Sequence, residues 1–215
     1  TTLIKEILSK NNLFSINPQA KIGYFSQDLS ILDESISILE NVMIDSIQSE
    51  TTIRNVLGNL SIKDNKVYEI VKNLSGGEKV KVALAKLLVS NSNFLILDEP
   101  TNFLDIESIE GLELLIKQYA GTVLLISHDK RFVDNVCDDI ILFKDKKLVQ
   151  FDGNYSDYLK YEENKDKNKA LSNDRLVLEF RLTKLDSEIS LENDSNKKLL
   201  LEKEREEILL KLKNS

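Results

Sequence analysis

The chain has 215 residues, of which 41% are hydrophobic and 30% charged, which is typical of one globular domain with an appendage. Its net charge of −7 argues against a general nucleic-acid binder that works through a basic surface. Because Cys137 is the single cysteine, an intrachain disulfide is excluded and a reducing, cytoplasmic location is favoured. No apolar run approaches the roughly 18 residues of a membrane helix, and no signal peptide is visible, so we expect no membrane-spanning segment.

The first part of the chain predicts a strand followed by a small helical subdomain. Residues 21–27, KIGYFSQ, are typical of a short apolar strand that ends at Gln27. From residue 28 to residue 90 the pattern is mostly helical, with a glycine stop expected at Gly58 and a helix N-cap at Asp64. We therefore expect residues 28–90 to form a helical subdomain inserted into a larger fold.

Residues 74–88, LSGGEKVKVALAKLL, predict an amphipathic helix with an unusual start. Ser75 and Glu78 have the S-x-x-E spacing of a capping box, which satisfies two backbone N–H groups. Gly76 and Gly77 lie in the first turn, although glycine costs a helix about 1 kcal/mol relative to alanine. The missing side chains expose the N–H groups at the positive end of the helix dipole, which suits a bound phosphate. A capped surface helix with a glycine-rich entry is the plainer alternative.

The middle of the chain alternates strands and helices. Apolar runs at 93–97 and 121–127 are typical of strands buried on both faces of a parallel sheet, and residues 105–119 between them predict a helix. A short helix over 130–137 and a closing hairpin over 139–153 follow. This alternation indicates a layered α/β domain.

The tail differs in composition and charge. From Lys160 to the end, 13 basic and 13 acidic residues cancel, and leucines such as Leu178 and Leu185 repeat every seven residues. The segment 191–196 interrupts the repeat. We therefore expect residues 159–215 to form a coiled-coil hairpin of two antiparallel helices, with one long helix or partial disorder as the alternative.

Reactive polar residues follow both apolar strands. The first strand runs into Asp98 and Glu99, and the second runs into His128. Because ligands bind at the carboxyl ends of strands in open α/β sheets, we expect the three side chains to share one crevice. Adjacent carboxylates suit a magnesium nucleotide, since one can hold Mg²⁺ while the other polarises an attacking water. Taken singly, the acidic pair has a plainer interpretation as a turn, and the histidine as a surface or capping residue.

Together, LSGGE, LILDEPTNFLD and LLISHD resemble the nucleotide-binding domain of ABC ATPases over residues 1–158. The resemblance implies a P-loop NTPase-like fold that hydrolyses ATP with Mg²⁺ between two ABC domains. It implies that Ser75, Gly76, Gly77 and Glu78 belong to a signature motif that faces an ATP held by the second domain. The other implied roles are Gln27 as the Q-loop glutamine and a metal ligand, Asp98 as the Walker B aspartate and a metal ligand, Glu99 as the catalytic glutamate, Asp105 as a D-loop contact and His128 as the switch histidine.

The phosphate loop of that family, G-x-x-G-x-G-K-[ST]-T-L, aligns only its last three positions with this chain, at Thr1, Thr2 and Leu3. The resemblance then implies that Thr1 is a magnesium ligand and Thr2 a nucleotide contact. The glycines and the lysine that hold the phosphates would lie upstream. We therefore expect the chain to be a fragment that binds ATP poorly and does not hydrolyse it measurably alone.

Further details resemble the ABC-F subfamily, cytosolic twin-domain ATPases that act on ribosomes. These are DEPTNFLD, with Phe103 where a histidine is common, and GNYSDYL at residues 153–159. Residues 20–42 resemble the second ABC domain of members that protect the ribosome from antibiotics. The resemblance implies a ribosomal partner, contacted through rRNA, with tRNA as a further candidate.

Several alternatives stay open at this point. The chain could be the first ABC domain of such a protein, or belong to a housekeeping translation factor of the same subfamily. It could also be the ATPase subunit of a membrane transporter, for which a longer helical subdomain and no charged tail would be usual. A DNA-repair ATPase would carry its coiled coil before the signature motif, and a degenerate assembly domain would not need intact Asp98, Glu99 and His128.

Overall fold

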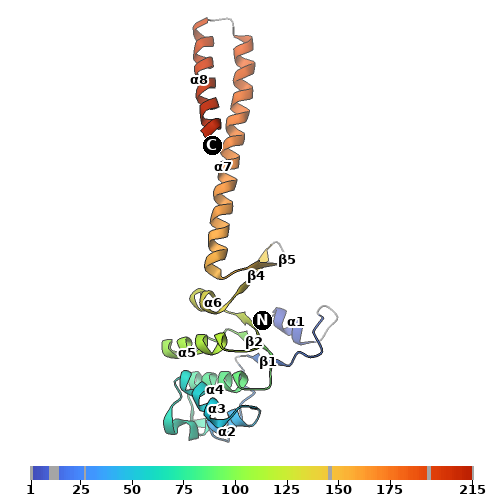
Figure 1. Cartoon of the computed structure of the whole chain (residues 1–215), viewed down its shortest axis with the longest axis vertical. Helices are drawn as coiled ribbons and strands as arrows, with labels where there is room; N and C mark the ends of the chain where they lie inside the picture. The colour runs from blue at the N-terminus through green and yellow to red at the C-terminus, as the bar shows by residue number, and fades with distance from the viewer. Residues whose placement is uncertain (1, 10–14, 27, 145–146, 193–194, 215) are drawn as a thin grey trace. The chain divides into compact units, whose positions relative to one another are not determined.

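The computed structural model describes residues 2–9, 15–26, 28–144, 147–192 and 195–214 (Figure 1). The chain forms two compact units, Thr1–Tyr155 and Ser156–Ser215. The expected division at residue 158 between an ATPase domain and a helical extension stays a prediction, because compactness says nothing of what each unit does.

A three-stranded parallel sheet lies at the centre of the first unit. Its strands are β1 (Ile22–Phe25), β2 (Phe94–Asp98) and β3 (Thr122–Ile126), in the order β1-β2-β3. Leu95, Ile96 and Leu97 of the central strand are fully buried, as a strand covered on both faces requires. Since all three strands are parallel, the residues that follow them meet at one edge of the sheet.

Between β1 and β2 the chain builds the helical segment. Its described residues, from 28 onward, form three α-helices and two 3₁₀ turns: α2 (Ile38–Met43), α3 (Glu50–Asn59), η1 (Asp64–Tyr68), η2 (Val71–Asn73) and α4 (Gly76–Leu88). Buried side chains of this segment, among them Leu57 and Leu84, belong to the same apolar cluster as Leu97 of the sheet and Phe132. The segment is therefore packed onto the sheet through one continuous core.

Two expectations for this segment were wrong. Helix α3 runs through Gly58 and ends after it, at a left-handed Ser61 with φ 62°. The amides of Ser61 and Ile62 donate to the carbonyls of Gly58 and Leu57 at 3.0 and 2.9 Å, the pattern of a Schellman motif. Asp64 does not cap an α-helix: its own φ is 54°, and the turn that follows is 3₁₀.

The rest of the first unit follows the predicted order. Helix α5 (Ile106–Lys117) joins β2 to β3, and α6 (Lys130–Val136) follows β3. Strands β4 (Asp139–Lys144) and β5 (Lys147–Asp152) form an antiparallel pair, as expected of the closing hairpin. The N-terminal helix α1 spans Thr2–Leu8. The chain thus has the expected layered α/β architecture.

The second unit contains two helices, α7 (Tyr155–Leu191) and α8 (Ser195–Asn214). Helix α7 starts one residue before the unit boundary at Ser156. Ion pairs between Arg181 and Glu204 and between Arg205 and Asp186 join the two helices, so the helical hairpin is confirmed. Coiled-coil packing stays a prediction. Among the described residues, none of the helices combines the length and apolar character that crossing a membrane requires.

Candidate functional site

The sheet brings Glu99 and His128 together, as predicted. Glu99 follows Asp98, the last residue of β2, and its backbone amide donates to the carbonyl of Ile126 at 2.8 Å. His128 follows β3 by two residues. Its Nε2 lies 3.4 Å from Oε1 of Glu99, and its backbone amide donates to Oε2 at 3.3 Å. The Glu99 side chain is only 18% exposed, whereas the His128 side chain is 99% exposed, so the histidine is free to meet a ligand.

Glu99 adopts a strained backbone conformation. Its φ is 53°, in the left-handed region, which costs a non-glycine residue roughly 1–2 kcal/mol. The hydrogen bond to Ile126 holds the backbone in this conformation and thereby turns the carboxylate towards His128. Strain held at one polar residue at the edge of a sheet is a feature of functional sites.

The loop after Glu99 ends in Asp105, whose carboxylate has two structural partners. One oxygen accepts the backbone amide of Ser108 at 2.8 Å and so caps α5. The other lies 2.5 Å from Nζ of Lys81 on α4. The hydrogen bond from Lys81, followed by that from Ser108, lowers the pKa of Asp105 to about 2. The geometry thus gives Asp105 a positioning role, while its proposed contact to nucleotide stays a prediction.

The first turn of α4 carries the capping box that the sequence predicted. Ser75 accepts the amide of Glu78, and the Glu78 carboxylate accepts the Ser75 amide at 2.8 Å and its hydroxyl at 2.7 Å. Glu78 also pairs with Lys66, which is the main reason that its pKa falls to about 2. The box fixes the orientation of the N–H groups at this helix end.

The two glycines of this turn have different surroundings. A Cβ built on Gly77 would lie 2.7 Å from the carbonyl oxygen of Phe103, so only glycine permits this close approach. A Cβ on Gly76 would meet nothing within 4 Å. Gly77 is therefore explained by packing inside the unit, whereas Gly76 leaves the start of α4 open.

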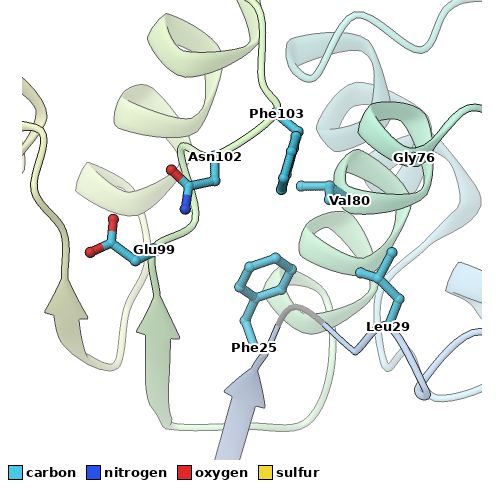
Figure 2. A pocket seen from close by; sticks show the side chains of 7 residues that line it. All are labelled: Phe25, Leu29, Gly76, Val80, Glu99, Asn102 and Phe103. Atoms are coloured by element: carbon cyan, nitrogen blue, oxygen red, sulfur yellow. The ribbon is translucent and has the colours of Figure 1, made fainter. Parts of the chain in front are cut away.

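A cavity of about 220 Å³ lies between the strand ends and α4 (Figure 2). Figure 2 shows the polar side chains of Glu99 and Asn102 on one side, and the aromatic rings of Phe25 and Phe103 with the apolar groups of α4 on the other. The residues that line the cavity are Phe25, Leu29, Gly76, Val80, Glu99, Asn102 and Phe103. The carboxylate of Glu99 and the open start of α4 thus border the same space.

Three predicted site residues are not placed with their side chains. Thr1 and Gln27 lie outside the described residues, and of Thr2 only the helical backbone is described. Asp98 is described, at the end of β2. No cluster of three or more metal-binding side chains occurs among the described residues.

The sequence did not single out Lys81. Its charge placed it on the polar side of the predicted helix, yet its side chain is only 10% exposed. The spacing of Lys81 and Asp105, 24 residues apart, carries no local signal. Within α4 the sequence offers Glu78, three residues earlier, as the nearer partner, but the Glu78 carboxylate is engaged by Ser75 and Lys66.

Comparison with known proteins places the chain in a family. Residues 6–102 match the ABC transporter family. The chain is 40% identical over 158 residues to the ATP-binding protein Uup of Buchnera aphidicola subsp. Schizaphis graminum, covering 69% of this chain and 27% of Uup. It is 41% identical over 140 residues to the erythromycin resistance ATP-binding protein MsrA of Staphylococcus epidermidis, covering 64% of this chain and 28% of MsrA.

Solved structures share the fold. An RNase-L inhibitor structure aligns with a TM-score of 0.54 and 26% identity, over 66% of this chain and 29% of that one. The dimeric post-hydrolysis structure of the ATP-binding cassette MJ0796, bound to ADP and Pi, aligns with a TM-score of 0.50 and 24% identity, over 62% of this chain and 63% of that one.

The fold is that of an ATP-binding cassette of the P-loop NTPase type. The chain belongs to the ABC ATPase family, and its curated relatives Uup and MsrA are ATP-binding proteins of the ABC-F type. It spans only a little over a quarter of the length of these relatives.

Proposed function

We propose that the intact protein hydrolyses ATP in the presence of Mg²⁺, with Glu99 as the catalytic base. The observation that carries this proposal is the pairing of Glu99 with His128 at the carboxyl ends of two adjacent parallel strands. Such a position lets one carboxylate orient and polarise a water while the exposed imidazole contacts the γ-phosphate. Family membership supports the same chemistry.

The metal would be held at the start of this loop. Asp98 is the described carboxylate in the right position, with Thr1 and Gln27 as further proposed ligands. When bound, Mg²⁺ neutralises charge on the phosphates. The protein's own part is positional: the strained turn at Glu99 keeps the carboxylate beside the histidine and at the border of the cavity.

We propose that a second ABC domain completes the site. The start of α4, with Ser75, Gly76 and Gly77, would face an ATP held by that domain. The capped N-terminus of α4 and the open space around Gly76 suit a phosphate that approaches from outside the unit. The MJ0796 cassette, which is dimeric and bound to ADP and Pi, supports this arrangement by analogy.

We further propose that the intact protein acts on the ribosome as an antibiotic-resistance protein of the protection type. The 41% identity to MsrA, whose name states erythromycin resistance, supports this assignment. Uup, at a similar identity, carries no resistance in its name, so a housekeeping translation factor is the second candidate. An ATPase subunit of a membrane transporter is the third, since the matched family is named for transporters.

The test uses the full-length protein with Glu99→Gln. The amide keeps the size of the side chain but cannot take a proton, so we expect ATP turnover to fall by about 100-fold or more with ATP still bound. Glu110→Gln, at an exposed carboxylate on α5, is the matched control and should stay within twofold of wild type. Unchanged turnover in Glu99→Gln would remove Glu99 from the role of base.

The same variant, locked on ATP, identifies the partner. After ATP is added to a lysate, sedimentation should carry the trapped protein with ribosomes, and the Glu110→Gln control should not accumulate there. Sedimentation with membranes and not with ribosomes would favour the transporter candidate and overturn the ribosomal assignment. If ribosomes are the partner, protection of translation against erythromycin separates a resistance role from a housekeeping role.

A further inference from the structure

Lys81 is a buried cation on the helix that carries the signature motif. Its side chain is 10% exposed, and its Nζ lies 2.5 Å from Oδ2 of Asp105, 24 residues away. A buried lysine is rarely left without a counter-charge. The pair therefore joins α4 to the end of the loop that begins at Glu99.

Asp105 connects this pair to a further element. Its other oxygen accepts the amide of Ser108 in the first turn of α5, and the Ser108 hydroxyl donates to the carbonyl of Leu60, just after α3. One carboxylate thus holds the signature helix, the loop and the next helix in a fixed relation.

The middle of the loop meets α4 as well. Phe103 has φ 67° and presents its carbonyl oxygen to Gly77, at 2.7 Å from the position of a Cβ. The first turn of the signature helix and the loop are therefore in backbone contact. Together with the Lys81–Asp105 pair, this contact fixes the loop against α4 at two points.

The other lysines of α4 pair differently. Lys79 binds Glu34 at 2.5 Å, and Lys86, whose side chain is 11% exposed, binds Asp45 at 3.1 Å. Both partners lie within the helical segment itself. Among the three, Lys81 is the one that reaches outside this segment to the loop after Glu99.

We propose that Lys81 is a positioning residue that couples the signature helix to the loop 100–105 and thereby to the catalytic Glu99. This inference rests on the proposed ATPase function. When α4 meets a nucleotide held by the second ABC domain, the pair transmits the position of α4 to the loop and so keeps the loop in register with Glu99. In this role Lys81 acts through Asp105 and the loop.

The experiment measures kcat and KM for ATP in the full-length protein. Lys81→Met keeps the buried stem and removes the charge, and we expect kcat to fall at least tenfold with KM changed less than threefold. Lys81→Arg, which restores the cation, should recover at least half of the activity. Lys86→Met is the matched control, because Lys86 is similarly buried and is also ion-paired, and it should stay within twofold of wild type.

A second variant separates coupling from loss of structure. Asp105→Asn keeps the cap on Ser108 but leaves the Lys81 ammonium buried without its counter-charge, so it should lower the Tm more than Lys81→Met does. Combining the two substitutions should restore much of that Tm, because no unpaired buried charge remains, but should not restore kcat. A Lys81→Met protein with the kcat of the Lys86→Met control overturns the proposal, as does a fall in kcat that Lys81→Arg does not reverse.

Glu99→Gln is measured in the same series. If wild type hydrolyses ATP and Glu99→Gln abolishes turnover while Lys81→Met matches its control, the positioning role fails and the proposed function stands. If Glu99→Gln leaves turnover unchanged, the proposed function itself fails, and the coupling proposal fails with it.

Discussion

The two units of the chain are stabilised by different means. In Thr1–Tyr155 the buried side chains form one large apolar cluster that runs from the helical segment to the sheet. In Ser156–Ser215, among the residues whose side chains the structure describes, only Leu185 and Ile208 are buried, and charged pairs such as Arg181–Glu204 join the helices. Burial of apolar surface is the main driving force of folding, whereas exposed ion pairs add only about 0–1 kcal/mol each.

This difference predicts which unit tolerates substitutions. The first unit has to hold Glu99, His128 and α4 in fixed relation, and a close-packed core provides that rigidity. The hairpin, with a thin apolar seam, has little to resist local opening. We therefore expect the stability of the first unit to fall when a single methyl group is added in its core. We also expect the hairpin to unfold at a lower temperature than the first unit.

The largest expected effect is Gly111→Ala in α5. A Cβ at this position would lie 1.8 Å from the backbone carbonyl oxygen of Asn59, which cannot move without shifting the end of α3. Overpacking of this kind costs about 3 kcal/mol of unfolding free energy, at the upper end of its usual range. Urea unfolding of the two proteins measures the change.

Gly58→Ala is the control for this prediction. Gly58 lies in the last turn of α3, and a Cβ there would meet nothing within 4 Å. Alanine should therefore raise the unfolding free energy, by up to about 1 kcal/mol. Equal stability of Gly111→Ala and Gly58→Ala would show that the helices of the first unit are not held as closely as the structure indicates.

The next effect concerns Leu185 in the hairpin, whose side chain is fully buried. Leu185→Ala should cost about 2–3 kcal/mol, which is large for a unit with so few buried side chains. We expect the hairpin to lose helicity by circular dichroism at a lower temperature, while the transition of the first unit keeps its midpoint. Leu210→Ala, at an exposed leucine of α8, should change neither transition.

A single transition that shifts as a whole in Leu185→Ala would contradict the separation of the two units. Limited proteolysis gives an independent measurement: cleavage of the variant should begin within residues 156–215 and leave the first unit intact.

The sequence predicted the elements whose signals are local. The capping box at Ser75 and Glu78 is visible in four consecutive residues and is confirmed, as is the buried strand β2. The run at 121–127 does form strand β3, but the expectation that it is buried on both faces was wrong: β3 lies at the end of the described sheet, and its residues are exposed or only partly buried. The convergence of Glu99 and His128 could be predicted because parallel strands end at the same edge of a sheet.

The features that the sequence did not predict depend on tertiary contacts. Gly58 was expected to end α3, but the left-handed residue of the Schellman motif is Ser61, because the buried Ile62 has to reach Leu57. Lys81 was placed on a polar face, but its partner Asp105 covers it from outside the helix. Neither the left-handed position of Ser61 nor the partner of Lys81 can be predicted from residue spacing within one helix.

The smallest expected effect is on the pH dependence of the unfolding free energy of the first unit. The hydrogen bond from Lys66, followed by those from Ser75, lowers the pKa of Glu78 from 4.5 to about 2. Since the folded pKa is below the unfolded one, the charged carboxylate stabilises the fold above pH 4.5, and this contribution is lost as the pH falls towards 2. At this partly exposed position we expect about 1 kcal/mol after solvent screening.

Glu78→Gln tests this contribution, because glutamine can keep the capping box while the charge is lost. The unfolding free energy of the variant should be about 1 kcal/mol below wild type at pH 7, with the difference shrinking between pH 4.5 and pH 2. Glu40→Gln is the matched control, since Glu40 forms the same box with Ser37 and has no lysine among its described partners. Its pH dependence should be smaller, because Ser37 alone lowers the pKa of Glu40. A difference between wild type and Glu78→Gln that stays constant from pH 7 to pH 2 would mean that the Lys66 pair does not contribute through charge.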